Sequence, residues 1–310
     1  MTLPQCVGHY RLTSPLSSGA TSSVFSAIDT ECSGKYAIKC IPKSELTPKQ
    51  LLLRTSEVFH HQLVTGCSPH VLPLQEIIDD DSYLFIVSKF CEGDLYQAIW
   101  HHRIYQRNDA LIKKTFVDIL DGVYACHSRG VFHRDLKPEN ILCKQGGNGI
   151  RIADFGLATR KRICRGTRCG TPDYMSPGQS PPLFHPRCTN ASLEQWSEDH
   201  IVYYPSLTDI WSLGIILVNL VTGRRPWKTA RASNVDFRAF LEDEDYLYNT
   251  FPISWALNQV LKWILCPNPM DRPQILQIRQ TILNMDTFYR ATWSPQNAAL
   301  GWSRRMALIQ

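Results

Sequence analysis

Two short polar motifs hold the residues of this sequence whose types and spacing are best suited to chemistry. They are His133-Arg134-Asp135-Leu136-Lys137-Pro138-Glu139-Asn140 and, further on, Asp154-Phe155-Gly156. Asp135 could orient a hydroxyl group and accept its proton, and Lys137, two residues later, could contact a phosphate. Asn140 and Asp154 offer the hard oxygen ligands that suit Mg²⁺. Such groups would serve phosphoryl transfer, which requires neutralised negative charge and a nucleophile held in line.

Both motifs resemble those of the eukaryotic protein kinase superfamily, where the first forms the catalytic loop and the second holds metal. The resemblance implies that Asp135 is the catalytic base and that Lys137 lies on the transferred phosphate. It also implies that Asn140 and Asp154 bind Mg²⁺. The alternative is that these are ordinary turn residues.

An upstream lysine matches a third motif of the same superfamily. Tyr36-Ala37-Ile38-Lys39 resembles the strand that carries the lysine bound to the nucleotide phosphates, which assigns this role to Lys39. The family's lysine pairs with a glutamate on the following helix, and Glu57 is the only acid in residues 51–64. The alternative for Glu57 is a solvated position on the helix face.

The segment that would cover the nucleotide departs from the family pattern. Residues 16–24 keep only the middle glycine of Gly-x-Gly-x-x-Gly, with Ser17 and Ser22 at the outer positions. Glycine permits positive φ and close approach to phosphate, so we expect weaker ATP affinity rather than none. The resemblance implies that ATP is bound by Ser17, Ser18, Gly19, Val24, Ala37, Lys39, Lys89, Cys91, Leu142 and Asp154.

The segment after the second motif resembles the activation and substrate-facing loops of serine/threonine kinases. Thr171, within residues 169–177, argues against tyrosine specificity. Phosphorylation of Thr167 could gather Arg134 and the basic run 160–168 around a phosphate and order the loop. The alternative is a solvated basic loop that also contacts acidic substrates. Glu139 and Asp94, however, match positions that bind a substrate arginine in some relatives, and these two acids would favour basic substrates.

Two later positions concern the support of the site. Asp209 resembles the aspartate that braces the backbone of the catalytic loop. Gly178 replaces a glutamate that in the family pairs with a buried arginine, here Arg272. An unpaired buried cation costs about 3–5 kcal/mol, so Arg272 has another partner, contacts solvent, or leaves its lobe marginally stable. Residues 209–214, 223–228, 240–246 and 251–254 resemble the fungal Ran/Pat-type kinases.

The secondary structure predicted around these residues changes from mainly strands to mainly helices along the chain. Short apolar and β-branched runs in residues 10–40 and 84–87 predict strands, and residues 51–64 predict a helix. Longer apolar periods predict helices at 95–102, 111–129 and 210–222, and a proline-rich loop separates the last two over 169–204. We therefore expect an α+β, bilobal protein kinase fold over residues 8–285, with an N-lobe at 8–90, a C-lobe at 91–285 and a tail at 286–310.

The composition of the chain argues against some classes of partner. Its 310 residues are 44% hydrophobic, enough for one large or two lobed cores, and carry a net charge of +5. The basic run lacks the interleaved aromatics that stack on bases, so we expect no nucleic acid. No uninterrupted apolar stretch is long enough to span a membrane, and residues 1–7 are unlike a secretory signal. We expect an intracellular monomer, in the cytoplasm or nucleus, with reduced cysteines.

The leading hypothesis is a serine/threonine protein kinase that acts in signalling. Its substrates would be the serine and threonine hydroxyls of proteins, and its cofactors ATP and Mg²⁺. The serine-substituted loop and Gly178 motivate a rival, a pseudokinase that acts as a binding scaffold. A phosphotransferase for small molecules is disfavoured by the loop around Thr171.

Overall fold

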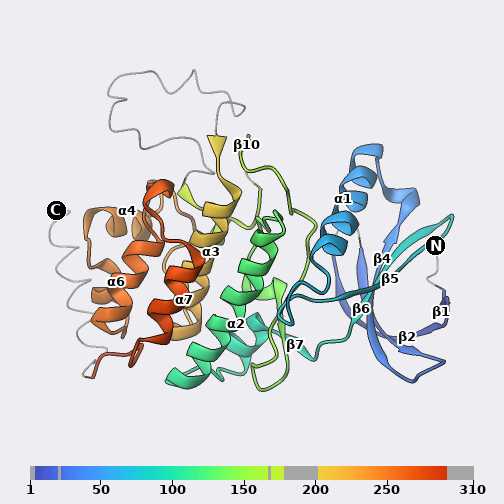
Figure 1. Cartoon of the computed structure of the whole chain (residues 1–310), viewed down its shortest axis with the longest axis horizontal. Coiled ribbons are helices and arrows are strands. Elements are labelled where there is room, and N and C mark those ends of the chain that lie inside the picture. The colour runs from blue at the N-terminus through green and yellow to red at the C-terminus, as the bar shows by residue number, and fades with distance from the viewer. Residues whose placement is uncertain (1–3, 20–21, 167–168, 178–201, 292–310) are drawn as a thin grey trace.

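The computed structural model describes residues 4–19, 22–166, 169–177 and 202–291, and these form two lobes (Figure 1). The smaller lobe contains a sheet and one long helix, α1, and the larger lobe contains most of the other helices. The arrangement confirms the predicted α+β class, with a small strand-rich lobe followed by a helical one.

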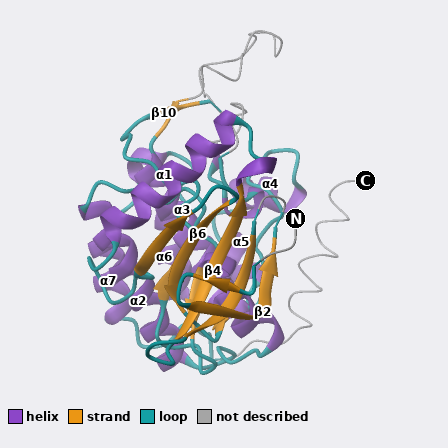
Figure 2. Cartoon of the chain, turned by 90° about the vertical axis from the view of Figure 1, so that its right-hand side faces the viewer, coloured by secondary structure: helices purple, strands orange, loops and turns teal. Residues whose placement is uncertain are grey.

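A single antiparallel sheet of six strands, in the order β1-β2-β3-β4-β6-β5, builds the small lobe (Figure 2). The strands are β1 (Cys6–Val7), β2 (Tyr10–Ser18), β3 (Ser23–Asp29), β4 (Lys35–Pro42), β5 (Leu74–Asp79) and β6 (Tyr83–Lys89). The predicted strand segments are confirmed in β2, β3, β4 and β6. β5 lies outside the predicted strands.

Alternation along β4 places Lys39 on the face of the sheet that α1 covers. Ile38 and Cys40 pack into an apolar cluster on one face. Ile41 packs on the other face, in a cluster that includes Val58 of α1. Since successive side chains of a strand point to opposite faces, Lys39 shares the face of Ile41.

Helix α1 (Pro48–Val64) begins three residues before the predicted segment. Thr47 forms a capping box with Gln50, whose side chain accepts the backbone N–H of Thr47 at 2.8 Å, and Pro48 occupies the first turn. These interactions satisfy backbone N–H groups that the start of a helix otherwise leaves without partners.

The large lobe is organised around α3 (Pro205–Thr222), the helix with the longest run of buried residues. Around it lie α2 (Asp109–Ser128), α4 (Val235–Glu242), α5 (Tyr246–Thr250), α6 (Trp255–Ile264) and α7 (Ile275–Leu283). Among the described residues, α3 alone is long and apolar enough to cross a membrane, but 83% of it is buried in the protein, as in a core helix.

Two small sheets complete the fold. β7 (Gly93–Asp94), β8 (Ile141–Cys143) and β9 (Arg151–Ile152) form one, and β10 (Cys164–Arg165) pairs with β11 (Val202–Tyr203) in the other. The helix expected over 95–102 is a single π-helical turn, Gln97–His101. The predicted loop 169–204 contains β11 and a 3₁₀ turn at Pro172–Tyr174 in its described parts.

Candidate active site

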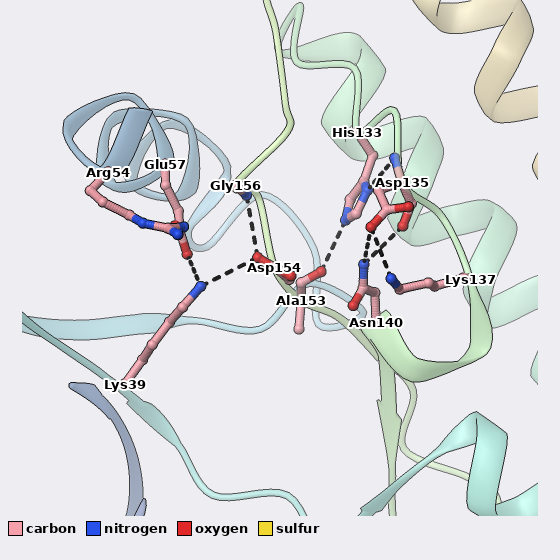
Figure 3. Close-up of polar contacts among 10 residues, drawn as sticks. All are labelled: Lys39, Arg54, Glu57, His133, Asp135, Lys137, Asn140, Ala153, Asp154 and Gly156. Carbon is pink, nitrogen blue, oxygen red and sulfur yellow. Dashed lines mark hydrogen bonds and ion pairs between the residues drawn. The ribbon is translucent and has the colours of Figure 1, made fainter. Parts of the chain in front are cut away.

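A hairpin brings the two polar motifs side by side. β8 directly follows the first motif, and only Ala153 separates β9 from the second. Ile141 of β8 pairs with Ile152 of β9. The backbone N–H of Ala153 donates to the carbonyl of Asn140 at 2.9 Å. A ring nitrogen of His133 lies 2.9 Å from the carbonyl of Ala153 (Figure 3). Asn140 and Asp154 therefore emerge next to each other.

Asp209 of α3 holds the backbone of the first motif. Its fully buried carboxylate accepts the backbone N–H groups of His133 and Arg134, each at 2.8 Å. Its Oδ2 also lies 2.8 Å from Nε2 of His127. Arg134 has φ +66°, a left-handed conformation that is unfavourable for residues other than glycine. The bracing role predicted for Asp209 is confirmed by these contacts.

Three polar side chains converge on Asp135. Nζ of Lys137 lies 3.1 Å from Oδ2 of Asp135. Asn140 Nδ2 donates to the carbonyl of Asp135 at 2.9 Å and to Oδ2 at 3.2 Å (Figure 3). Thr171 donates to Oδ1 of Asp135 from both its backbone N–H and its hydroxyl, each at 2.8 Å. Lys137 also donates to the hydroxyl of Thr171 at 2.8 Å.

Gly170 allows the loop that carries Thr171 to approach the first motif closely. Its φ is +113°, and a Cβ at this position would lie 2.6 Å from the carbonyl oxygen of Arg134. No side chain fits such a contact without a shift of the backbone, so glycine is required here. The loop resembling a substrate-facing segment is thereby held against Asp135.

Across the cleft, Lys39 forms the ion pair that the sequence predicts with Glu57. Its Nζ lies 2.5 Å from Oε1 of Glu57 and 3.5 Å from Oδ1 of Asp154 (Figure 3). Glu57 is only 3% exposed and also pairs with Arg54 at 3.0 Å, which excludes the solvated alternative. Burial lowers the pKa of Lys39, but the carboxylates of Glu57 and Asp154 outweigh it and raise the pKa overall.

The charge on Asp154 is stabilised in the same network. Partial desolvation raises the pKa of Asp154, but Lys39, His133 and the backbone N–H of Gly156 lower it below its usual value. The N–H of Gly156 lies 3.4 Å from Oδ1 of Asp154. Asp154 is therefore ionised at neutral pH, as a metal ligand must be.

Phe155 connects the site to α1. Its ring centroid lies 5.2 Å from that of His133 and 5.2 Å from that of His61. His61, on α1, also contacts the carbonyl of Leu72 at 2.8 Å. The position of α1, which sets that of Glu57, is thus linked by packing to both polar motifs.

The candidate catalytic groups face a cleft of about 320 Å³ between the lobes. Gly19, Ser22, Lys39, Asp135 and Asp154 are among its lining residues. The turn of the predicted phosphate loop is closed by a hydrogen bond from Gly19 N–H to the carbonyl of Ser22 at 2.8 Å. The hydroxyls of Ser18 and Ser23 pair at 3.2 Å across the strands. Ser22, which replaces the last glycine of the family's Gly-x-Gly-x-x-Gly, also lines the cleft.

The other residues expected to bind ATP lie on strands of the small lobe and near the junction of the lobes. Ser17 pairs with Val24 in the sheet, and Ala37 lies opposite Ser88. Lys89 ends β6 and is exposed, Cys91 is half-buried in the following segment, and Leu142 lies in β8. Their contact with ATP remains a prediction.

Arg54 is a member of the site that the family motifs did not indicate. Its only signal is its position, one turn before Glu57 on α1, where oppositely charged side chains can pair. Arg54 lines the same cleft, together with Gln50 and Leu53 of the first turns of α1. The arginine therefore adds positive charge to the wall of this cleft.

The predicted regulatory residues are described only in part. Thr167 and Arg168 lie outside the described residues. Lys161, Arg162 and Arg165 of the basic run are exposed, whereas Arg134 is partly buried. Glu139 is exposed, and Asp94 accepts the backbone N–H of Gln97 at 2.8 Å. Binding of a substrate arginine by these two acids remains a prediction.

Arg272 has partners other than the missing glutamate. It is 6% exposed and donates to the carbonyls of Cys266 at 2.8 Å, Leu207 at 2.8 Å and Pro267 at 3.3 Å. Its guanidinium also lies 4.9 Å from the ring centroid of Trp211. Burial lowers the pKa of Arg272 to about 9. Gly178 lies outside the described residues.

Replacing Arg272 by Lys is expected to lower the free energy of unfolding by about 2–3 kcal/mol, because an ammonium cannot reach three carbonyls in a planar fork or stack on Trp211. Urea unfolding measures the change. The matched control is Arg279→Lys, which alters a solvent-accessible ion pair with Asp121 and should cost at most about 1 kcal/mol. Equal losses in the two variants would contradict the role assigned to the carbonyls.

Comparison with known proteins agrees with this geometry. The sequence matches the protein kinase domain family over residues 10–283. It is 32% identical over 287 residues to a negative regulator of sexual conjugation and meiosis from Schizosaccharomyces pombe, covering 90% of this chain and 61% of the relative. It is also 32% identical over 288 residues to serine/threonine-protein kinase ksp1 of that yeast, covering 88% and 56%.

A plant relative, CBL-interacting protein kinase 32 of Oryza sativa subsp. japonica, is 30% identical over 290 residues, covering 87% of this chain and 58% of the relative. The chain spans about three fifths of the length of these relatives. Two of these three relatives come from a fungus. The family match and these relatives show that the chain belongs to the eukaryotic protein kinase superfamily.

Proposed function

We propose that the chain transfers the γ-phosphoryl group of Mg-ATP to serine and threonine hydroxyls of proteins that act in signalling. The observation that carries this proposal is the convergence of Lys137, Asn140 and Thr171 on Asp135, opposite the ion pair of Lys39 with Glu57. Every position at which the family places a catalytic group is filled by the appropriate side chain.

The donor set fits Mg²⁺. Asn140 uses its amide nitrogen to bind Asp135, which leaves its oxygen available as a ligand. The side chain of Asp154 is 47% exposed toward the cleft and ionised. Carboxylate and amide oxygens are the ligands that this ion takes in phosphoryl-transfer sites. Bound Mg²⁺ would neutralise negative charge on the phosphates.

The chain's own residues would perform the remaining steps. Lys39, held by Glu57, binds the phosphates of the nucleotide. Lys137 contacts the transferred phosphoryl group, and Asp135 orients the substrate hydroxyl and accepts its proton. The hydroxyl of Thr171, 2.8 Å from Asp135, shows that an aliphatic hydroxyl fits beside this carboxylate.

The setting of this activity is part of the proposal. We place it in the cytoplasm or nucleus, which is supported by the ten described cysteines being free thiols. A protein substrate, rather than a small molecule, is supported by the loop around Thr171 lying against the catalytic residues.

The test is transfer of labelled γ-phosphate to serine- and threonine-containing peptides with Mg-ATP, with and without EDTA. The chain should phosphorylate these peptides only when Mg²⁺ is present. Lys39→Met should lower kcat/KM for ATP at least about 10-fold and reduce the rise in Tm that millimolar Mg-ATP produces. Lys43→Met, four residues along in the turn that follows β4, should change neither.

Absence of transfer by the unaltered chain, with no rise in Tm on adding Mg-ATP, would overturn the proposal in favour of a scaffold that does not bind nucleotide. If Lys39→Met matched the unaltered chain in kcat/KM for ATP and in the rise in Tm, Lys39 would not belong to the nucleotide site.

A further inference from the structure

The guanidinium of Arg134 is bound by neutral groups in this structure. Its Nε donates to the carbonyl of Leu157 at 2.6 Å, and its Nη1 donates to the hydroxyl of Tyr203 at 3.0 Å. The thiol of Cys164 lies 4.0 Å from the same Nη1. Within residues 4–19, 22–166, 169–177 and 202–291, no carboxylate forms an ion pair with this arginine.

Strand pairing explains how Tyr203 reaches an arginine that lies far from it in the sequence. β11 pairs antiparallel with β10, with Cys164 opposite Tyr203 and Arg165 opposite Val202. Successive side chains of a strand point to opposite sides, so Val202 is 48% exposed while Tyr203 is 5% exposed. The buried side of this small ribbon faces Arg134.

The stretch of chain from Tyr203 to Asp209 binds both the side chain and the backbone of Arg134. Tyr203 lies two residues before the start of α3, and it binds the guanidinium. Asp209, in the second turn of α3, accepts the backbone N–H of Arg134. Two consecutive elements, β11 and the start of α3, therefore hold both the side chain and the left-handed backbone of the residue that precedes Asp135.

Arg134 in turn links three segments that must be aligned for transfer. It belongs to the catalytic loop, its bond to Leu157 reaches the segment that follows Gly156, and its bond to Tyr203 reaches the ribbon of β10 and β11. A phosphate on an activation segment can order that segment by pairing with an arginine, whereas here neutral groups already hold Arg134 against both segments.

We propose that Tyr203 is a positioning residue whose hydroxyl holds Arg134 in place, so that phosphoryl transfer does not require a phosphate on the activation segment. This inference rests on the proposed function. Phosphorylation at Thr167 would then add to an arrangement that already exists. Tyr203 acts through Arg134 and does not contact the reacting groups.

The test compares kinetics after treatment with a protein phosphatase and removal of that phosphatase. The treated chain and Thr167→Ala should both retain at least about half of the kcat of the untreated chain. Tyr203→Phe, which deletes only the hydroxyl, should lower kcat at least about 5-fold with an unchanged KM for ATP. The matched control is Tyr204→Phe, the neighbouring half-buried tyrosine, which should retain full kcat.

A double-mutant cycle tests whether Tyr203 acts through Arg134. Arg134→Met should lower kcat at least as much as Tyr203→Phe, and the double variant should be no worse than Arg134→Met alone. Loss of activity on phosphatase treatment, unchanged kcat in Tyr203→Phe, or additive losses in the cycle would each overturn this inference while leaving the proposed function standing. Absence of transfer by the untreated chain would overturn both.

Discussion

Replacing Asp135 by Asn is expected to lower the rate of phosphoryl transfer at least about 100-fold, because the amide cannot accept the proton of the substrate hydroxyl. The amide oxygen can still accept both hydrogen bonds from Thr171, so that loop should stay in place, whereas the amide nitrogen would replace the oxygen that Lys137 and Asn140 contact. Peptide phosphorylation under saturating Mg-ATP measures the change in kcat. The rise in Tm on adding Mg-ATP should be preserved.

The control for this variant is Asp121→Asn, which makes the same change of charge on α2. Asp121 pairs with Arg279 at the surface, and both side chains are about one-third exposed. This control should keep full activity. Transfer by Asp135→Asn at the rate of the unaltered chain would remove Asp135 from the chemical step. If Asp135→Asn lost both transfer and the rise in Tm on adding Mg-ATP, the substitution would have damaged the nucleotide site.

The candidate catalytic groups could be picked out from the sequence because their side chains can do chemistry that few other residues can do. A carboxylate base, two metal ligands and a lysine at fixed spacing leave little freedom in type, whichever elements carry them. The strands of the small lobe were also predictable, because β3, β4 and β6 carry dense β-branched and apolar runs.

Other parts of the fold gave weaker patterns. β5 is half-buried along most of its length, without a clear alternation of apolar and polar residues. The helices after Gly223 were not predicted, although α6 carries buried residues at helical spacing, Leu257, Leu261 and Ile264. The period of that pattern would have indicated an amphipathic helix.

The supports of the site depend on contacts between distant parts of the chain. The bond between Arg134 and Tyr203 spans 69 positions, and nothing near either residue indicates it. The partners of Arg272 are backbone carbonyls, which every residue possesses and no motif can specify. Such interactions become visible only once the tertiary structure brings the groups together.

Asp209 supports the site through backbone contacts, and its replacement by Asn should have a large effect on stability as well as on rate. Both carboxylate oxygens accept hydrogen bonds, from His133, Arg134 and His127. An amide would keep one acceptor and turn a donor toward an N–H group in a fully buried site. We expect the free energy of unfolding to fall by about 3 kcal/mol, because hydrogen bonds to charged groups contribute about 1.5–3 kcal/mol each.

The same variant should lower kcat at least about 10-fold, since the left-handed backbone of Arg134 would no longer be held and Asp135 would lose its position. Urea unfolding and peptide phosphorylation at a temperature well below the lowered Tm separate the two effects. Asp121→Asn again serves as the control, with an expected cost within about 1 kcal/mol. A stable Asp209→Asn variant with full kcat would show that the catalytic loop keeps its conformation without this brace, and that the local contacts of Asp135 with Thr171 and Asn140 suffice to hold it.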